Sequence, residues 1–260
     1  MKATSMNILE SVILAAALVS GASASQKPIK GDFICEHPPY TVSLVSKSPL
    51  VAYLHNFITP KERAHLQEVT KDSFSRSGVT GADGEHSVRT SQSTSVAPDD
   101  VVRCIEDRAL AFQGYDVQRS HVEPLQLVKY GIGQRYHFHT DWFTDLSHAT
   151  ADLGGNRVSS FFAYVHVSND TTGGGTNFPI LDAPRDSRWC SIVDCDEPYE
   201  NGATFRPIEG NAVYWENLFP NGMGDERTLH AGLPVTTGQK IGMNIWTRQG
   251  PLSDEIRGDR

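Results

Sequence analysis

The chain has 260 residues with 31 acidic and 23 basic side chains, which gives a formal net charge of −8 at pH 7. This acidic balance argues against the basic surface that nucleic-acid-binding proteins present, so nucleic acid is not expected as a partner. Hydrophobic residues make up 38% of the chain and charged residues 21%, a composition typical of globular domains. The sequence contains no run of about 18 uncharged apolar residues, so we expect no transmembrane segment in the mature protein.

The N-terminus has the order of features that is typical of a secretory signal peptide. Lys2 gives a basic start, residues 12–19 form a short apolar run, and residues 21–24 (Gly-Ala-Ser-Ala) supply a small-residue cleavage site. Glu10 departs slightly from the pattern, and a buried or disordered N-terminal helix is the alternative interpretation. We therefore predict a signal peptide over residues 1–24.

Four cysteines and one sequon fit a chain that passes through the secretory pathway. An even number of cysteines in that context predicts disulfides, and the simplest of the three possible pairings by proximity joins Cys35 to Cys104 and Cys190 to Cys195. Asn169 begins an Asn-Asp-Thr sequence that is an acceptor for N-glycosylation. The alternative is four unpaired thiols in a reducing compartment. We expect the endoplasmic reticulum lumen or the extracellular space as the location.

Two helices are predicted in the first half of the chain. Thr59 is a candidate N-cap, followed by a proline at the first helical position and a glutamate three residues after the cap. This helix is expected to run for about four turns with Leu66 and Val69 on its buried face. A second helix is predicted between residues 98–100 (Pro-Asp-Asp) and Gly114, where apolar residues recur at three- and four-residue spacing.

Short strands are predicted from residue 124 onward, where β-branched and aromatic residues are bounded by Gly, Asn and Pro. Helices followed by many short strands indicate a mainly β sandwich or jelly roll with flanking helices. We expect one domain over about residues 31–250, with an N-terminal helical part at about 51–120 and a jelly-roll core at about 124–248. The predicted strands lie at residues 125–130, 160–167, 212–215 and 242–247, and residues 182–201 are predicted to form a long surface loop.

Residues 130–143 contain a pattern that predicts a metal site. If this segment is extended, His139 and Asp141 project from the same face, because side chains alternate along a strand. A second histidine from a distant strand would complete a two-His, one-carboxylate triad, the ligand set of non-haem Fe(II) oxygenases. A His-x-Asp pair alone often occurs by chance, so the inference depends on the surrounding residues. His137 projects to the same side and is expected to be a neighbour of the ligands.

The same segment resembles the prolyl 4-hydroxylase family, whose pattern Tyr-Gly-x-Gly-Gln-x-Tyr-x-x-His-x-Asp-x-Phe is met at every fixed position. The resemblance extends over about residues 51–249 and implies a double-stranded β-helix, which is a jelly roll. It also implies that Fe(II) is held by His139, Asp141 and His230. The family has a basic residue ten positions after the distal histidine, and Lys240 occupies that position here.

The resemblance further implies a pocket for 2-oxoglutarate. Lys240 would face the C5 carboxylate of this cosubstrate, because a buried anion without a counter-charge is costly. Tyr130 and Tyr164 match aromatic positions of the family's cosubstrate pocket. Trp246, six residues after Lys240, resembles the family's pocket-lining tryptophan.

Three arginines are candidates for binding the substrate. Arg89, in an Arg-Thr-Ser tripeptide, looks like part of the family's substrate-side loop. Arg157 matches an arginine that faces the substrate channel, and an ordinary surface arginine is the alternative interpretation. Arg248 ends a Trp-Thr-Arg sequence where many family members have Trp-x-His. This departure leaves the metal ligands unchanged and leaves the identity of the substrate open.

The activity that the resemblance implies is hydroxylation of peptidyl proline at C4, with O2 and 2-oxoglutarate consumed and ascorbate as the reductant that keeps the iron ferrous. Two alternatives remain, since a fold alone does not fix a substrate. One is a dioxygenase of the same mechanism that acts on a small molecule or on another amino acid. The other is a jelly-roll binding protein without turnover.

Overall fold

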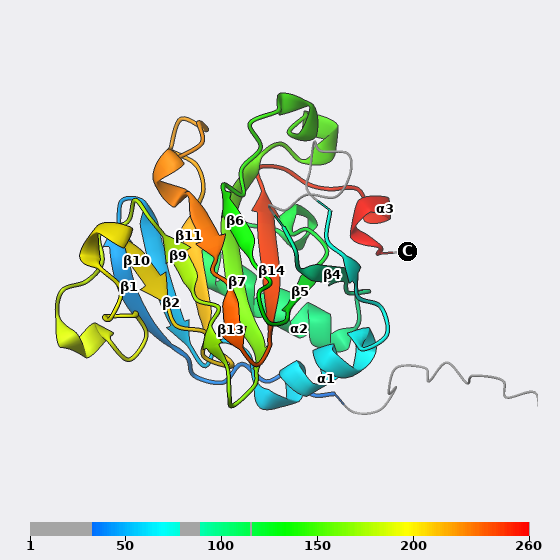
Figure 1. Cartoon of the computed structure of the whole chain (residues 1–260). Helices are drawn as coiled ribbons and strands as arrows, with labels where there is room; N and C mark the ends of the chain where they lie inside the picture. Colours follow the sequence, from blue (N-terminus) through cyan, green and yellow to red (C-terminus); the bar gives the residue numbers. More distant parts are fainter. Residues whose placement is uncertain (1–32, 79–88, 115, 260) are drawn as a thin grey trace, which may run out of the picture. The chain divides into compact units, whose positions relative to one another are not determined.

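A computed structural model of the chain describes residues 33–78, 89–114 and 116–259 (Figure 1). The part of the chain from Phe33 onward forms one compact unit. The predicted signal peptide at residues 1–24 lies outside the described residues. Within the described ranges, none of the helices has the length and apolar character needed to cross a bilayer.

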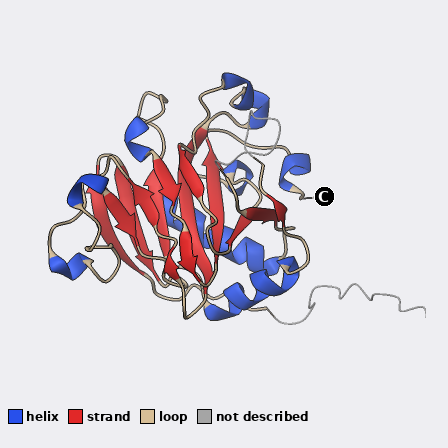
Figure 2. Cartoon of the chain, in the orientation of Figure 1, coloured by secondary structure: helices blue, strands red, loops and turns tan. Residues whose placement is uncertain are grey.

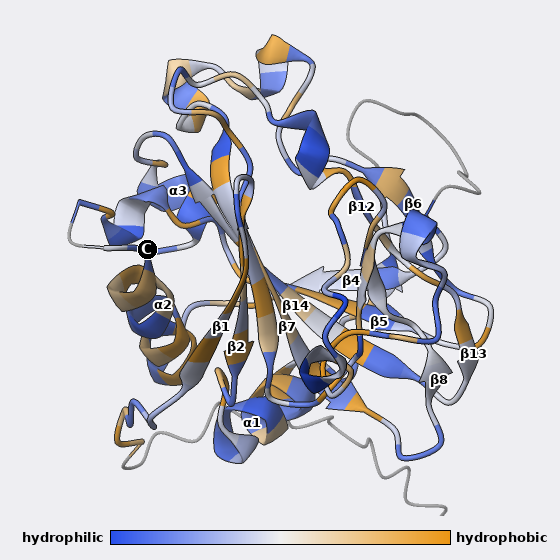
Figure 3. Cartoon of the chain, turned by 90° about the vertical axis from the view of Figure 1, so that its left-hand side faces the viewer, coloured by the Kyte–Doolittle hydropathy of each residue, from blue (hydrophilic) through white to orange (hydrophobic). Residues whose placement is uncertain are grey.

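Two antiparallel sheets form the body of this unit (Figures 1 and 2), and they face each other, which confirms the predicted jelly roll (Figure 3). The main sheet has eight strands in the order β1-β2-β11-β7-β14-β5-β4-β3, and the smaller sheet has four in the order β10-β9-β12-β6. The strands of the main sheet are β1 (Thr41–Lys47), β2 (Leu50–His55), β3 (Ser75–Arg76), β4 (Gln92–Ser95), β5 (Gln126–Tyr130), β7 (Arg157–Val167), β11 (Ala212–Glu216) and β14 (Lys240–Arg248). Those of the smaller sheet are β6 (Tyr136–His139), β9 (Thr176–Phe178), β10 (Ala203–Phe205) and β12 (His230–Gly232), and β8 (Thr172–Gly173) pairs with β13 (Val235–Thr237).

The central strands of the main sheet are buried on both faces, which explains why apolar residues of β7 and β14 point to both sides of the sheet. In β7, Phe161, Ala163 and Val165 belong to a core cluster shared with the helices. Phe162 and Tyr164 belong to a second cluster that lies between the sheets. The strand therefore contributes alternate side chains to two cores, as the two-residue period of a strand requires.

Two long helices, α1 (Pro60–Thr70) and α2 (Asp100–Gln113), cover the outer face of the main sheet, opposite the smaller sheet (Figure 3). The predicted capping box of α1 is confirmed, because Thr59 Oγ1 accepts from the backbone N–H of Glu62 at 3.1 Å and the Glu62 carboxylate accepts from that of Thr59 at 2.7 Å. The expected length was wrong, since α1 has 11 residues, about three turns. Val69 is 39% exposed and Thr70 is buried instead, because a step of four from Leu66 stays on the buried face.

Strands also form in the part that we expected to be helical, residues 51–120. β2 lies inside the main sheet between β1 and β11, and β4 pairs with β5. Because β2 is buried on both faces, it is a short apolar run without alternation, which periodicity cannot distinguish from a buried helical segment. The compact unit also continues beyond residue 250, where α3 (Asp254–Arg257) places the buried Arg257 within 3.2 Å of Glu106 of α2.

Both predicted disulfides are present. Cys35–Cys104 joins the segment before β1 to α2, and Cys190–Cys195 closes a short loop within residues 182–201. That segment contains two short 3-10 helices, η4 (Ser187–Trp189) and η5 (Tyr199–Asn201), and no strand, which confirms the predicted long loop. It does not lie wholly on the surface, because Ile192 and Val193 are buried in the core between the sheets.

Candidate active site

Two histidines face each other at the edge of the smaller sheet. His139 ends β6, His230 begins β12, and the two residues are direct partners in the antiparallel register, with ring centroids 4.3 Å apart. His139 Nδ1 donates to the carbonyl of His137 at 2.8 Å, and His230 Nδ1 donates to that of Thr228 at 2.9 Å. Because a carbonyl can only accept, both rings carry their proton on Nδ1 and leave Nε2 free to bind a metal.

Asp141 completes the group, although β6 does not extend to it. The expectation of a continuous strand through His139 and Asp141 was wrong, since β6 ends at His139 and Asp141 lies in a bend. Its Oδ1 atom is still 3.6 Å from His139 Nε2 and 3.8 Å from His230 Nε2. The three donor atoms lie within 4.8 Å of one another, as a shared metal ion requires.

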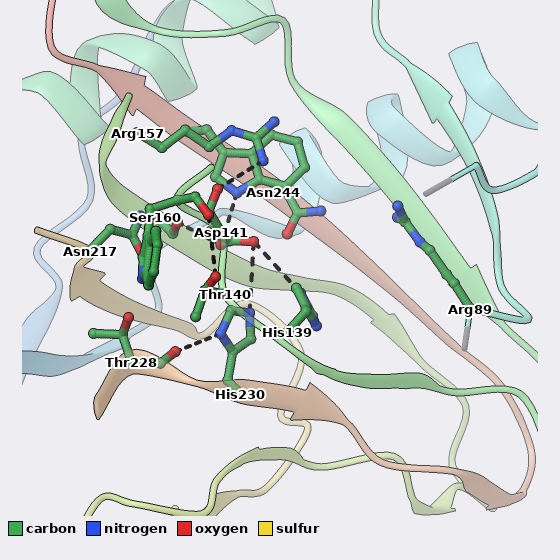
Figure 4. A network of polar contacts seen from close by, with 12 residues as sticks. Arg89, His139, Thr140, Asp141, Arg157, Ser160, Asn217, Thr228, His230 and Asn244 are labelled. Atoms are coloured by element: carbon green, nitrogen blue, oxygen red, sulfur yellow. Dashed lines mark hydrogen bonds and ion pairs between the residues drawn. The ribbon is translucent and has the colours of Figure 1, made fainter. Parts of the chain in front are cut away.

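The second oxygen of Asp141 is held by the main sheet (Figure 4). Asp141 Oδ2 accepts from Ser160 Oγ of β7 at 2.6 Å and from Trp246 Nε1 of β14 at 2.9 Å. The Asn217 amide donates to Ser160 Oγ at 2.9 Å. Trp246 was expected to line the pocket, which it does, but Ser160 and Asn217 were not predicted. Their contacts depend on how β7 and β11 are aligned, and no local motif marks them.

The residues around His139 and Asp141 favour the protonation states in which these side chains bind a divalent metal. Burial lowers the pKa of His139 to about 3, which keeps the ring neutral. Burial alone would raise the pKa of Asp141, but the neighbouring His230, His139 and Arg157 and the hydrogen bond from Ser160 lower it overall. Neutral imidazoles and an ionised carboxylate are the forms that bind metal.

The loop that precedes His230 is fitted against the residue that follows Asp141. A Cβ atom at Gly224 would lie 2.3 Å from the indole ring of Trp142, so only glycine permits this contact. Trp142 Nε1 also donates to the carbonyl of Asp225 at 3.3 Å. The two loops that carry metal-binding candidates are therefore packed directly on each other.

Lys240 is completely buried on β14, opposite Tyr130 of β5. Its ammonium group donates to the carbonyl of Gly174 and lies 4.7 Å from the ring centroid of Tyr130 and 5.5 Å from that of Phe162. Burial lowers the pKa of Lys240 to about 7, and no carboxylate in the described part of the chain forms an ion pair with it. A buried cation without a counter-charge is costly, so the site is suited to an anionic ligand.

A cavity lies beside the three candidate ligands. Tyr130 and Trp246 line it directly, while Tyr164 lies behind it and shares a hydrogen bond of 2.8 Å with the lining residue Thr176. The cavity is lined by Tyr130, Tyr136, His139, Asp141, Phe162, Thr176, His230, Gly232, Asn244 and Trp246.

Arg89 is buried against Tyr136, a residue that lines this cavity, with its guanidinium 4.5 Å from the ring centroid of Tyr136. Tyr136 in turn stacks on His139 at 3.6 Å. Arg89 also donates to Ser91 Oγ at 3.3 Å and to Gln126 Oε1 at 3.2 Å. Its ring contact connects it to a candidate metal ligand through one aromatic side chain.

Arg157 and Arg248 share a single carboxylate. Glu123 accepts from Arg157 at 2.7 and 2.8 Å and from Arg248 at 2.5 Å. Arg157 also lies 3.6 Å from the ring centroid of Trp246, whereas Arg248 bonds the carbonyl of His148 at 3.1 Å. Both arginines are therefore part of the framework behind the cavity.

Comparisons with known proteins agree with this geometry. Residues 125–248 match the family model of the 2OG-Fe(II) oxygenase superfamily. Prolyl 4-hydroxylase 2 of Arabidopsis thaliana is 32% identical over 217 residues, 80% of this chain and 70% of that protein. Prolyl 4-hydroxylase subunit alpha-3 of Mus musculus is 31% identical over 81% of this chain and 36% of its own length. The viral collagen prolyl hydroxylase of Paramecium Bursaria Chlorella virus-1, solved with 2OG, has the same fold, with a TM-score of 0.56 at 22% identity over 76% of this chain and 95% of that chain.

We expect His139→Ala, Asp141→Ala and His230→Ala each to abolish Fe(II) binding, because each removes one donor of three. Calorimetric titration with Fe(II) under anaerobic conditions measures this. His137→Ala is the matched control, since the ring of His137 is exposed and only its carbonyl contacts a ligand. Loss of iron in His137→Ala with retention in His139→Ala would contradict the assignment.

Proposed function

Because the chain belongs to the prolyl 4-hydroxylase family of Fe(II)- and 2-oxoglutarate-dependent oxygenases, we propose that it hydroxylates peptidyl proline at C4. The observation that carries the proposal is the convergence of His139, Asp141 and His230 on one point beside a cavity. In this proposal the three residues hold Fe(II). Three donors leave positions on the ion open for reactants, as in other two-His, one-carboxylate sites.

The cavity and Lys240 fit 2-oxoglutarate as the cosubstrate. A buried lysine without a carboxylate partner matches the C5 carboxylate, and the aromatic rings of Tyr130 and Phe162 contact both the cavity and the ammonium group. Tyr164 supports the wall of the cavity, because its hydroxyl shares a hydrogen bond with that of the lining residue Thr176. The oxidising chemistry would come from bound iron, 2-oxoglutarate and O2, and would yield succinate and CO2 together with the hydroxylated product.

The protein's own part is to orient the reactants and to exclude water. Trp246 lines the cavity and at the same time donates to Asp141, so one side chain shapes the pocket and fixes a metal ligand. Arg89, Arg157 and Arg248 are proposed to contact the peptide or to hold the residues that do. Ascorbate is the proposed reductant that keeps the iron ferrous.

We place the protein in the endoplasmic reticulum lumen or outside the cell. The two disulfides fit an oxidising compartment. Asn169 is exposed, as a glycosylated asparagine must be. The predicted signal peptide provides the route of entry.

Proline-rich and collagen-like peptides incubated with the protein, Fe(II), 2-oxoglutarate and ascorbate are expected to gain one oxygen atom on proline. Tandem mass spectrometry locates the added oxygen, and hydrolysis followed by chromatography distinguishes 4-hydroxyproline from its isomers. Asp141→Ala serves as the inactive control. Conversion of 2-oxoglutarate to succinate without peptide hydroxylation would indicate a different substrate, and no conversion at all would indicate a protein without turnover.

Lys240→Ala is expected to raise the KM for 2-oxoglutarate about a hundredfold or more. Removing one partner of a buried charge pair costs about 3 kcal/mol or more, and each 1.4 kcal/mol corresponds to about tenfold. Iron affinity should change little, because Lys240 is not a metal-binding candidate. Lys129→Ala is the control, because this half-buried lysine of the neighbouring strand β5 does not line the cavity. An unchanged KM would show that another cation binds the carboxylate.

The affinity for 2-oxoglutarate is also expected to fall as the pH rises above about 7. The pKa of the buried Lys240 is about 7 in the ligand-free protein, so below this pH the lysine is already charged and ready to bind the anion. Above it, binding must take up a proton, which weakens affinity by up to about tenfold per pH unit. Anaerobic calorimetry in buffers of different ionisation enthalpy counts this proton.

Lys240→Arg provides the control for the pH effect, because a guanidinium stays protonated throughout this range. Its affinity for 2-oxoglutarate, even if lower, should not vary with pH between about 6 and 9. The same pH dependence in both proteins would assign the titration to another group.

A further inference from the structure

Ser160 lies at the centre of a buried hydrogen-bond chain that ends on the Asp141 carboxylate (Figure 4). Ser160 and Asn217 are both completely buried, and Asp141 is 6% exposed. Asn217 follows β11, Ser160 is on β7, and Asp141 lies beyond the end of β6, so three separate segments meet here. The two bonds of this chain measure 2.6 Å and 2.9 Å, and among its three members only Asp141 reaches the cavity.

The direction of these bonds follows from the chemistry of their members. An ionised carboxylate only accepts, so the Ser160 hydroxyl must donate its proton to Asp141 Oδ2. The Ser160 oxygen is then free to accept, and it accepts from the Asn217 amide. Trp246 Nε1, which can only donate, reaches the same Oδ2 atom. One oxygen of Asp141 thus receives two hydrogen bonds, while Oδ1 faces the two histidines.

We propose that Ser160, oriented by Asn217, is a positioning residue that reserves Oδ1 of Asp141 for the metal and keeps this ligand monodentate. The inference rests on the proposed metal site and deepens it. A carboxylate that turned to bring both oxygens onto the ion would occupy two coordination positions in place of one. The hydrogen bonds to Oδ2 oppose this rotation and so keep one more position open for reactants.

Ser160→Ala tests the proposal through metal binding alone. Loss of a hydrogen bond to a metal ligand typically lowers metal affinity about 10- to 100-fold, which we expect for Fe(II) by anaerobic calorimetry. The visible absorption spectrum of the Co(II)-loaded protein should also change, because it reports the number and geometry of the ligands. Ser160→Cys keeps nearly the same shape with a weaker donor and should give a smaller change in the same direction.

Asn217→Leu removes the group that orients Ser160. We expect it to weaken Fe(II) binding less than Ser160→Ala does. Because both residues act through the same carboxylate oxygen, the double variant should bind no more weakly than Ser160→Ala alone. Fully additive losses would show that Asn217 acts independently of Ser160.

Ser159→Ala is the matched control. Ser159 is the adjacent residue on β7, is 2% exposed, and donates to Gln113 Oε1 at 2.5 Å on the opposite face of the sheet. It should destabilise the fold, as judged by urea denaturation, much as Ser160→Ala does. Ser159→Ala should leave the Fe(II) affinity and the Co(II) spectrum as in the unchanged protein. If Ser160 had only a structural role, Ser160→Ala would give the same result as Ser159→Ala.

The proposal is overturned if Ser160→Ala and Ser160→Cys bind Fe(II) with the original affinity and show the original Co(II) spectrum. That result, together with intact proline hydroxylation by the unchanged protein, would leave the proposed function standing. Conversely, a protein that binds Fe(II) with the expected dependence on Ser160 but does not hydroxylate proline would retain this inference and lose the proposed substrate. A protein that binds no Fe(II) would contradict both.

Discussion

The hydrogen bonds from Ser160 and Trp246 to Asp141 connect the two sheets at the point where the candidate metal ligands meet. Asp141 follows a strand of the smaller sheet, yet its carboxylate is held by two strands of the main sheet. The histidines, by contrast, are paired within the smaller sheet. The geometry of the site therefore depends on the separation and alignment of the two sheets, and the core between them sets both.

That core reaches the metal site without interruption. The ring of His230 lies 4.7 Å from that of Trp215 and 5.4 Å from that of Phe178, two buried residues of the cluster between the sheets. Such packing restricts the histidine to one orientation, while its Nδ1–H bond to a carbonyl selects the tautomer. Aromatic packing fixes where the ring lies, and the backbone determines which nitrogen it offers. Lys240, which is buried against the cavity-lining rings of Tyr130 and Phe162, needs the same rigid surroundings, because a flexible wall would admit water to its ammonium group.

The sequence predicted the parts of the site that follow from short-range pattern. His139 and Asp141 occur in a motif, and His230 and Lys240 have a fixed spacing, so their residue types and positions could be inferred from family resemblance. Ser160, Asn217 and Glu123 could not, because their importance comes from pairing between strands that are far apart in the chain. The fold shows the same division. The capping box identified α1, whereas β2, buried on both faces, lacks the alternation that marks a strand.

Successive side chains of β7 point to opposite faces of the sheet, and this limits where the chain can accept insertions or deletions. Ser159 bonds α2 on one face of the strand, and Ser160 bonds Asp141 on the other. Deleting or inserting one residue in the strand would exchange the two faces, so the helical layer and the metal site would lose their partners together. Length changes are tolerated far better in exposed loop segments such as residues 185–188 and 198–201. Relatives that differ in substrate can therefore be expected to vary in such loops while the strand keeps its length and phase.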